Sequence, residues 1–215
     1  FALNANNYAQ DLRISIRGFG ARSAFGIRGI KIIVDGIPET TPDGQGQLDN
    51  LDLYSIEKVE IVRGAASSLY GNASGGVIYI TSNQNVDSNF VELNGGLGSY
   101  GIQKYDAVFG LVKDHFQSIV HASHAKANGY REQSSFENNT FNTNWIYAKN
   151  DRTKWSGNIN YTNAPIGDDP GGITLEDVNI DRTQARVRNV QFKAGESIQQ
   201  LKGSVSFQKE IGNLS

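Results

Sequence analysis

The chain of 215 residues has no cysteine, only three histidines and four prolines. Without cysteine these residues can form no disulfide, thiol nucleophile or thiolate metal site. No uninterrupted apolar run approaches the roughly 20 residues that a membrane-spanning helix needs, and the mean hydropathy is −0.42. Strands could still cross a membrane, because a barrel strand needs only about 10 residues of alternating polarity.

The net charge and the catalytic residue types also limit which classes of function are possible. A formal net charge of −2 gives no reason to expect nucleic acid as a partner. No nucleophile–base–acid set is evident, so we predict no enzyme activity. On a strand, His121 and His124 point to opposite faces and cannot share a metal, and His115 stands apart, so we predict no metal site and no cofactor. Residues 18–23 (GFGARS) lack the third glycine and the lysine of a phosphate loop.

The most informative stretch is residues 56–82, IEKVEIVRGAASSLYGNASGGVIYITS. Val59 and Ile61 alternate with Lys58 and Glu60, and this period of two predicts a strand. A glycine-rich segment follows, and Gly75 introduces a second apolar run over residues 77–80. Two short strands joined in this way predict the middle of a small mixed sheet.

Two more strands are predicted upstream. Apolar residues alternate with polar ones over residues 12–18, and residues 30–34 form a second apolar run that stops at Asp35-Gly36, a strong turn signal. Three loops, over residues 4–10, 19–26 and 39–47, would be supported by this sheet. Glycines mark the second loop, and a proline and glycines mark the third. Loops held by a rigid scaffold are where binding functions tend to lie.

These motifs resemble a known family. Residues 57–71 with 75–80 resemble the signature that ends the plug domain of TonB-dependent outer-membrane receptors. Residues 16–20 (IRGFG) and 33–38 (IVDGIP) resemble two earlier pieces of the same domain, in the family's order. Ala65 departs from the pattern, since the family usually carries proline there.

The resemblance implies where a ligand would bind. In the family, apical loops of the plug rise toward a ligand pocket inside the barrel. Each matching residue could instead belong to a solvated turn, but as a set we expect them to contact ligand. By position they are Asn6, Asn7, Tyr8, Arg22, Ser23, Thr41, Asp43 and Gln45.

The resemblance also implies how the plug is seated. In the family, arginines at the positions of Arg17 and Arg63 meet glutamates on the barrel wall. A buried arginine is costly unless it is paired, and its planar fork suits carboxylates. Within the chain, Glu57 and Glu60 could serve as local partners.

After residue 85 the strands become longer. Aromatic and aliphatic residues alternate with polar ones over residues 141–147, 155–161 and 201–207. Short connections at 113–114 and 149–152 alternate with long ones at 128–138 and 164–182, as in an outer-membrane barrel. The aromatic rows alone would equally suit a soluble β-sandwich. We count about seven candidate strands. The resemblance implies a barrel of 22 strands, and seven are too few to close it.

The expected fold is therefore mainly β with a small α+β plug. It comprises a mixed-sheet plug domain at residues 1–85, with its N-terminal part missing, and antiparallel strands of an incomplete transmembrane β-barrel at residues 86–215. Because seven strands cannot close the barrel, we expect the N-terminal portion of a longer receptor. No signal peptide is visible, so we also expect a chain that is processed or cut at its N-terminus.

The expected function is that of a transporter fragment in the bacterial outer membrane. The resemblance implies binding of a scarce nutrient, most often a ferric siderophore or other iron chelate, and its import when TonB displaces the plug. The expected partners are TonB, through a segment before Phe1, the nutrient and outer-membrane lipid. A soluble β-rich carbohydrate-binding or adhesin module is the alternative, and a hydrolase is a weaker one.

Overall fold

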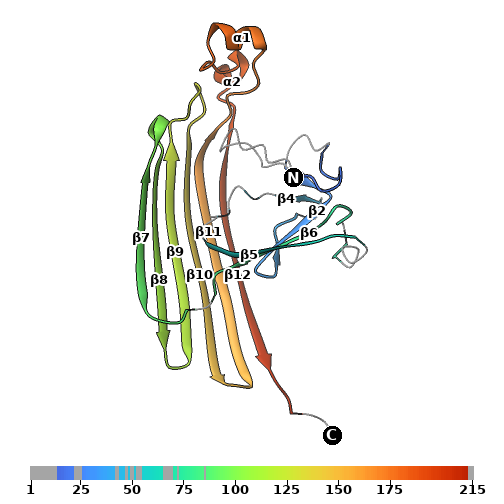
Figure 1. The fold of residues 1–215 in the computed structure, drawn as a ribbon, viewed down its shortest axis with the longest axis vertical. Coiled ribbons are helices and arrows are strands. Elements are labelled where there is room, and N and C mark those ends of the chain that lie inside the picture. The colour runs from blue at the N-terminus through green and yellow to red at the C-terminus, as the bar shows by residue number, and fades with distance from the viewer. Residues whose placement is uncertain are drawn as a thin grey trace. The chain divides into compact units, whose positions relative to one another are not determined.

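The computed structural model describes residues 14–21, 26–41, 44–46, 48, 51, 55–64, 70–71, 73–84 and 86–212, and its fold is mainly β (Figure 1). The chain forms two compact units. The first comprises Phe1–Ser82, Tyr130–Ser135 and Gly167–Glu196, and the second comprises Asn83–Gly129, Phe136–Ile166 and Ser197–Ser215. No helix in the described part of the chain is long and apolar enough to cross a membrane.

The first unit contains a four-stranded sheet with the strand order β3-β2-β6-β5. Strands β2 (Ile30–Val34) and β6 (Gly76–Ser82) are parallel and lie in the centre. Strands β3 (Ile37–Pro38) and β5 (Ile56–Val62) are the antiparallel edges. The two central strands are nearly continuous apolar runs, as parallel strands covered on both faces require. The predicted mixed sheet is thus confirmed.

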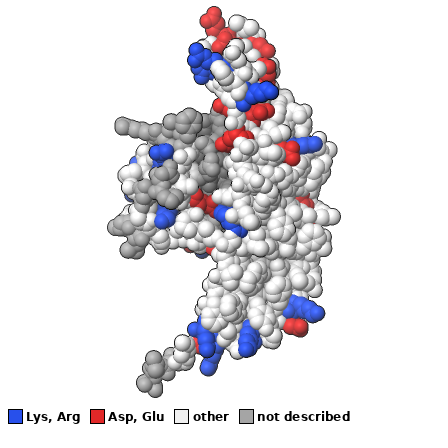
Figure 2. All heavy atoms as spheres, turned by 180° about the vertical axis from the view of Figure 1, so that it is seen from behind, with Lys and Arg blue, Asp and Glu red and all other residues white. Residues whose placement is uncertain are grey.

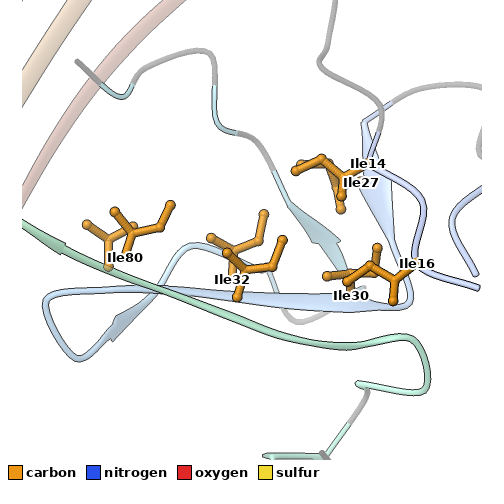
Figure 3. Close-up of a cluster of buried hydrophobic side chains, with 8 residues drawn as sticks. Ile14, Ile16, Ile27, Ile30, Ile32 and Ile80 are labelled. Atoms are coloured by element: carbon orange, nitrogen blue, oxygen red, sulfur yellow. The ribbon is translucent and has the colours of Figure 1, made fainter. Parts of the chain in front are cut away.

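The core of this sheet consists largely of isoleucine. On one face, eight buried side chains form a single cluster, of which Figure 3 labels six. Its members are Ile14, Ile16, Ile27, Ile30, Ile32, Val34, Ile78 and Ile80. A smaller cluster on the other side joins Ile33, Ala73 and Val77 to the partly buried Tyr70 and Tyr79. The short strands β1 (Ile27–Arg28) and β4 (Gln45–Gly46) pair separately as a two-stranded sheet.

One strand prediction is wrong in part. The pattern over residues 12–18 predicted a strand that runs through Arg17, and residues 12–13 lie outside the described part. Ile16 makes only an isolated bridge to Phe19, closed by two backbone hydrogen bonds of 3.0 Å. Between them, Arg17 (φ 52°) and Gly18 (φ 86°) form a two-residue turn. Glycine accepts positive φ without strain, so the Arg-Gly pair favours a tight turn over a continuing strand.

The second sheet has six strands in sequential order, β7 to β12 (Figure 1). We predicted about seven strands in this part of the chain, so that count is too high by one. The register shows that β7, β8, β9 and β10 are antiparallel neighbours. The bounds of the strands are Phe90–Leu97, Gln103–Lys113, Phe116–Ala127, Phe136–Asn150, Thr153–Asp168 and Gly195–Lys209.

The register separates an apolar face of this sheet from a polar face. Paired residues share a face, so Val91, Phe109 and Val120 form one apolar row across three strands. The rings of Trp155 and Phe207, tilted by 43° with centroids 4.5 Å apart, continue the apolar face across β11 and β12. The large, largely exposed side chains of the apolar face are Val91, Leu93, Tyr105, Phe109, Phe141, Tyr147, Trp155, Ile159, Leu201, Val205 and Phe207. Figure 2 shows a broad surface over the strands that is almost free of charged side chains.

The connections between these strands alternate in length, as predicted. Residues 114–115 and 151–152 are tight turns, whereas 128–135 and 169–194 are long. We expected the second long loop at residues 164–182, but β11 continues to Asp168 and the connection contains two helices. These are α1 (Leu175–Ile180) and α2 (Val187–Gln191). Helix α1 forms because Thr174 and Asp177 make a reciprocal capping box.

Candidate ligand-binding and plug-seating positions

Two of the predicted ligand-binding residues, Thr41 and Gln45, lie in a turn of the first unit. The Thr41 backbone N–H and its hydroxyl both donate to the carbonyl of Gln45, at 2.8 and 2.9 Å. The side-chain carbonyl of Gln45 accepts from the Arg28 guanidinium at 3.4 Å. In the structure these polar groups stabilise the turn, and contact with a ligand stays a prediction.

The other predicted ligand-binding residues lie outside the described part of the chain. They are Asn6, Asn7, Tyr8, Arg22, Ser23 and Asp43. Of the eight predicted residues, the structure therefore brings only Thr41 and Gln45 together.

The four predicted plug-seating residues are all described and all exposed to solvent. Arg17 lies in the tight turn after Ile16, and Arg63 directly follows β5. Glu60 pairs with Lys58 at 2.9 Å across an exposed surface. Among the described ion pairs, none joins Arg17 or Arg63 to Glu57 or Glu60. Seating of the plug through these residues stays a prediction.

Asp35 has a structural role that sequence analysis did not identify. It occupies the first position of the predicted Asp-Gly turn with φ 49°. Its carboxylate accepts from the backbone N–H of Ser82 at 2.8 Å and from the Ser82 hydroxyl at 2.6 Å. The turn after β2 therefore holds the end of the parallel strand β6. The Asp-Gly pair signalled the turn, but the partner 47 residues away is fixed only by the fold.

The Tyr70–Tyr79 pair was also missed. The two rings meet edge to face with centroids 5.6 Å apart, and the Lys31 ammonium donates to the Tyr70 carbonyl at 2.9 Å. The hydrogen bond to Tyr70, with burial and the charge of Tyr70 as smaller causes, raises the pKa of Tyr79 to about 12. The Tyr79 phenol is therefore neutral at physiological pH.

The polar face of the six-stranded sheet carries a buried charged group. Asp106 lies 3.6 Å from the Lys104 ammonium and 3.7 Å from the His121 ring. Beside it, the hydroxyls of Ser123 and Thr140 are hydrogen bonded at 2.7 Å. Buried polar groups are usually paired in this way, because an unpaired one is costly to desolvate.

His121 and His124 point to opposite faces of the sheet, as predicted. The register places His121 opposite Val108 on the polar face, and His124 opposite Tyr105 on the apolar face. His124 shares a hydrogen bond of 2.7 Å with Asn139 and stacks on the Tyr105 ring. Within the described residues, no three acidic or histidine side chains are grouped to hold a metal ion.

Comparison with known proteins agrees with this architecture. Residues 2–77 match the family described as the TonB-dependent Receptor Plug Domain. The chain carries the plug domain of the TonB-dependent receptor family. Strands β2, β3 and β5 of the four-stranded sheet fall within this match, β6 (Gly76–Ser82) begins at its end, and the six-stranded sheet follows.

This chain also matches individual relatives over part of its length. It is 37% identical over 97 residues to the rhizobactin receptor of Rhizobium meliloti (strain 1021), a match that spans 40% of this chain and 13% of that receptor. The chain therefore matches only a small part of that relative's length.

Solved structures share the fold over most of the chain. The unliganded ferric citrate transporter FecA superposes with a TM-score of 0.70 at 23% identity, over 86% of this chain and 30% of that one. The ferric enterobactin receptor PfeA gives a TM-score of 0.63 at 16% identity, over 98% of this chain and 35% of that one. At these identities the likeness shows a plug followed by barrel strands, and it does not identify a ligand.

Proposed function

We propose that this chain is part of an outer-membrane transporter that binds a ferric siderophore or another iron chelate and imports it when TonB displaces the plug. The observation that carries the proposal is the succession, in one chain, of a TonB-dependent receptor plug domain and a sheet with an exposed apolar face. A soluble carbohydrate-binding or adhesin module would account for the aromatic rows but not for the plug domain.

The apolar face supports a location in the outer membrane of a Gram-negative cell. Its aliphatic and aromatic side chains are exposed, whereas polar groups such as Asp106 and His121 on the opposite face are buried. A barrel wall in lipid needs an apolar outer row and a polar inner row. Every backbone group of a strand in lipid must also be hydrogen bonded, which the continuous ladders of the six-stranded sheet provide for the inner strands.

The plug would act by occlusion rather than by chemistry. We propose the boundary between plug and barrel at residue 85, with Arg17 and Arg63 seating the plug against carboxylates of the wall. Both guanidiniums are exposed, and ion pairs at exposed sites contribute about 1 kcal/mol or less. Such contacts can break under a pull from TonB while the isoleucine core stays folded. No catalytic residue is assigned.

The proposed ligand class follows from the named relatives. The rhizobactin receptor, the ferric citrate transporter and the ferric enterobactin receptor are all named for iron chelates or siderophores. The copper transporter OprC shares the fold as well, with a TM-score of 0.61. Any test of ligands must therefore include a copper complex.

Growth under iron limitation tests the proposal. The gene for the full-length receptor is deleted, and growth is measured on a panel of ferric siderophores, ferric citrate, cobalamin, copper and oligosaccharides. We expect loss of growth on one iron chelate, restored by the gene, and the same loss in a strain that lacks TonB. Normal growth on every iron chelate, or uptake that persists without TonB, would contradict the proposal.

A further inference from the structure

Three consecutive residues between β9 and β10 all donate hydrogen bonds to the connection between β11 and β12. The Arg131 guanidinium donates to the carbonyls of Gln184 (3.0 Å), Gly171 (2.7 Å) and Pro170 (3.4 Å). The backbone N–H of Glu132 donates to the Thr183 carbonyl at 2.7 Å.

Gln133 completes this set of donors. Its side-chain amide donates to the carbonyl of Asn189 inside α2 (2.7 Å) and to that of Ala194, three residues beyond the end of α2 (2.9 Å). Gln133 itself has φ 50°, so the short loop is wound tightly enough to turn successive groups toward the longer one. Six donated hydrogen bonds thus join residues 131–133 to residues 169–194.

Apolar burial in the longer loop is confined to two small residues outside its helices, Pro170 and Ala185. Neither α1 nor α2 contains a buried residue. Leu175, Ile180, Val187 and Phe192 are each at least 74% exposed. A six-residue and a five-residue helix are also far too short to be stable alone in water. The polar contacts must therefore hold this segment in place.

Arg131 is suited to make the largest contribution. Its planar fork donates from three nitrogens at fixed angles, and hydrogen bonds from a charged donor are stronger than neutral ones. Its partners lie on both sides of α1. Pro170 and Gly171 come before this helix, and Gln184 comes after it. One side chain thus fixes the path of the loop on both sides of α1.

The geometry points to a clamp: Arg131, with Gln133, locks residues 130–135 and 169–194 into a single prefolded body, so that the two loops open and close together. The short loop cannot move away without breaking the contacts that order the long one. This inference concerns the loops alone and holds whatever ligand the receptor takes.

Limited trypsin digestion of the full-length receptor, purified in detergent, tests the clamp. Trypsin can cut the long loop after Arg182, Arg186, Arg188 and Lys193, all of them exposed. We expect Arg131→Ala to raise the initial cleavage rate at these sites about tenfold, because cleavage follows the population of the opened loop. The control is Lys126→Ala, which removes an exposed cation near the end of β9, whereas Arg131 is half-buried. It should leave the rate unchanged.

A cross-link separates loss of the clamp from general damage. Residues 1–215 contain no cysteine, so in a receptor cleared of any cysteine elsewhere, Glu132→Cys with Thr183→Cys gives one defined pair beside the Glu132–Thr183 backbone hydrogen bond. Added to Arg131→Ala, this pair should restore slow cleavage when oxidised and fast cleavage when reduced. The inference is overturned if Arg131→Ala is cut no faster than Lys126→Ala. It is equally overturned if the oxidised cross-link forms and does not slow cleavage of the long loop.

Discussion

The two sheets of this chain differ in where their apolar side chains lie. Side chains point alternately to the two faces in both sheets, but apolar side chains are buried in one and exposed in the other. In the two central strands of the four-stranded sheet, apolar side chains are buried, and Ile32 is 0% exposed. In the six-stranded sheet, apolar residues face outward, with Leu93 72% exposed, whereas Thr162 is 0% exposed. The period of two therefore predicts strands in both regions, but it does not indicate which solvent each face meets.

Chemical composition separates the two regions where periodicity does not. Branched aliphatic side chains fill the first core, and they suit tight packing away from solvent. Aromatic residues such as Phe109, Tyr147 and Trp155 are prominent on the apolar face of the second sheet. Aromatic rings are also typical of the lipid-facing side of outer-membrane barrels.

The largest expected effect is in the isoleucine core. Ile32→Ala removes a fully buried side chain from the centre of the four-stranded sheet and should destabilise it by about 2–5 kcal/mol. Hydrogen exchange of β2 and β6 in the purified full-length receptor measures this. Val59→Ala on the exposed edge strand is the control and should change stability by about 0.5 kcal/mol or less. Equal effects at both positions would mean that burial does not distinguish the central strand β2 from the edge strand β5.

A charged side chain on the apolar face should destabilise the receptor in the membrane. Val205→Arg places a guanidinium on the face proposed to meet lipid and should cost about 2–4 kcal/mol if that position lies near the bilayer midplane. Its neighbour Ser204 lies on the polar face, so Ser204→Arg should cost far less. Both variants are compared by the fraction of folded receptor in the outer membrane. Similar yields for the two arginine variants would contradict a lipid-facing assignment.

A glycine beneath an aromatic ring tests the packing within the apolar face. A Cβ atom at Gly157 would lie 2.6 Å from the Trp145 ring and 2.7 Å from the Ser204 carbonyl. Gly157→Ala should therefore destabilise the sheet by about 1–3 kcal/mol, measured as a lower unfolding temperature in detergent. At Gly95 the nearest atom would be 3.8 Å away, on Tyr105, so Gly95→Ala is the control and should be tolerated.

Charge reversal tests the proposed seating of the plug. Arg17→Glu and Arg63→Glu should each weaken the seat by about 1 kcal/mol or less, because both side chains are exposed. We expect cells with these receptors to admit bulky antibiotics more readily while the receptor still binds ligand. Arg28→Glu, at an exposed arginine of the same unit, is the control. Normal exclusion of antibiotics and normal uptake in both variants would count against seating by these arginines.

The smallest expected effect is a response of α1 to acid. The Thr174 hydroxyl and then its backbone N–H donate to the Asp177 carboxylate and lower its pKa. A lowered pKa means that the ionised carboxylate stabilises the helix start above its ordinary pKa, and that this contribution is lost as the pH falls through the lowered value. Hydrogen exchange of residues 175–180, corrected for its intrinsic pH dependence, should accelerate below about pH 4. Thr174→Ala should reduce this pH dependence, and an unchanged profile in that variant would contradict the cap.

Local patterns predicted much of the fold. The Asp35-Gly36 turn, the strand from Ile30 and the alternation in β8, β10, β11 and β12 follow from turn chemistry and the period of two. The same rules were wrong at Arg17, where a strand-like pattern contains a tight turn. They also missed α1, although Thr174 and Asp177 have the spacing of a capping box. A six-residue helix is too short to leave an apolar period.

Long-range contacts could not be predicted from sequence. Arg131 reaches carbonyls 39 to 53 residues away, and nothing in its local sequence indicates that register. The same holds for Asp35 and Ser82, which meet only because β2 and β6 run parallel. The predicted ligand residues Thr41 and Gln45 show a further limit, because their polar groups also serve the turn that holds them.

Spin-label accessibility along β12 tests the central claim most directly. Single substitutions from Leu201→Cys to Gln208→Cys are labelled in a full-length receptor from which any cysteine outside residues 1–215 is removed, since these residues contain none. The labelled receptors are reconstituted in lipid. We predict that odd positions, beginning with Leu201, are accessible to oxygen dissolved in lipid, and that even positions are accessible to a water-soluble nickel chelate. Alternation of the opposite sense, or no alternation, would contradict the account of a plug domain followed by a lipid-facing barrel wall.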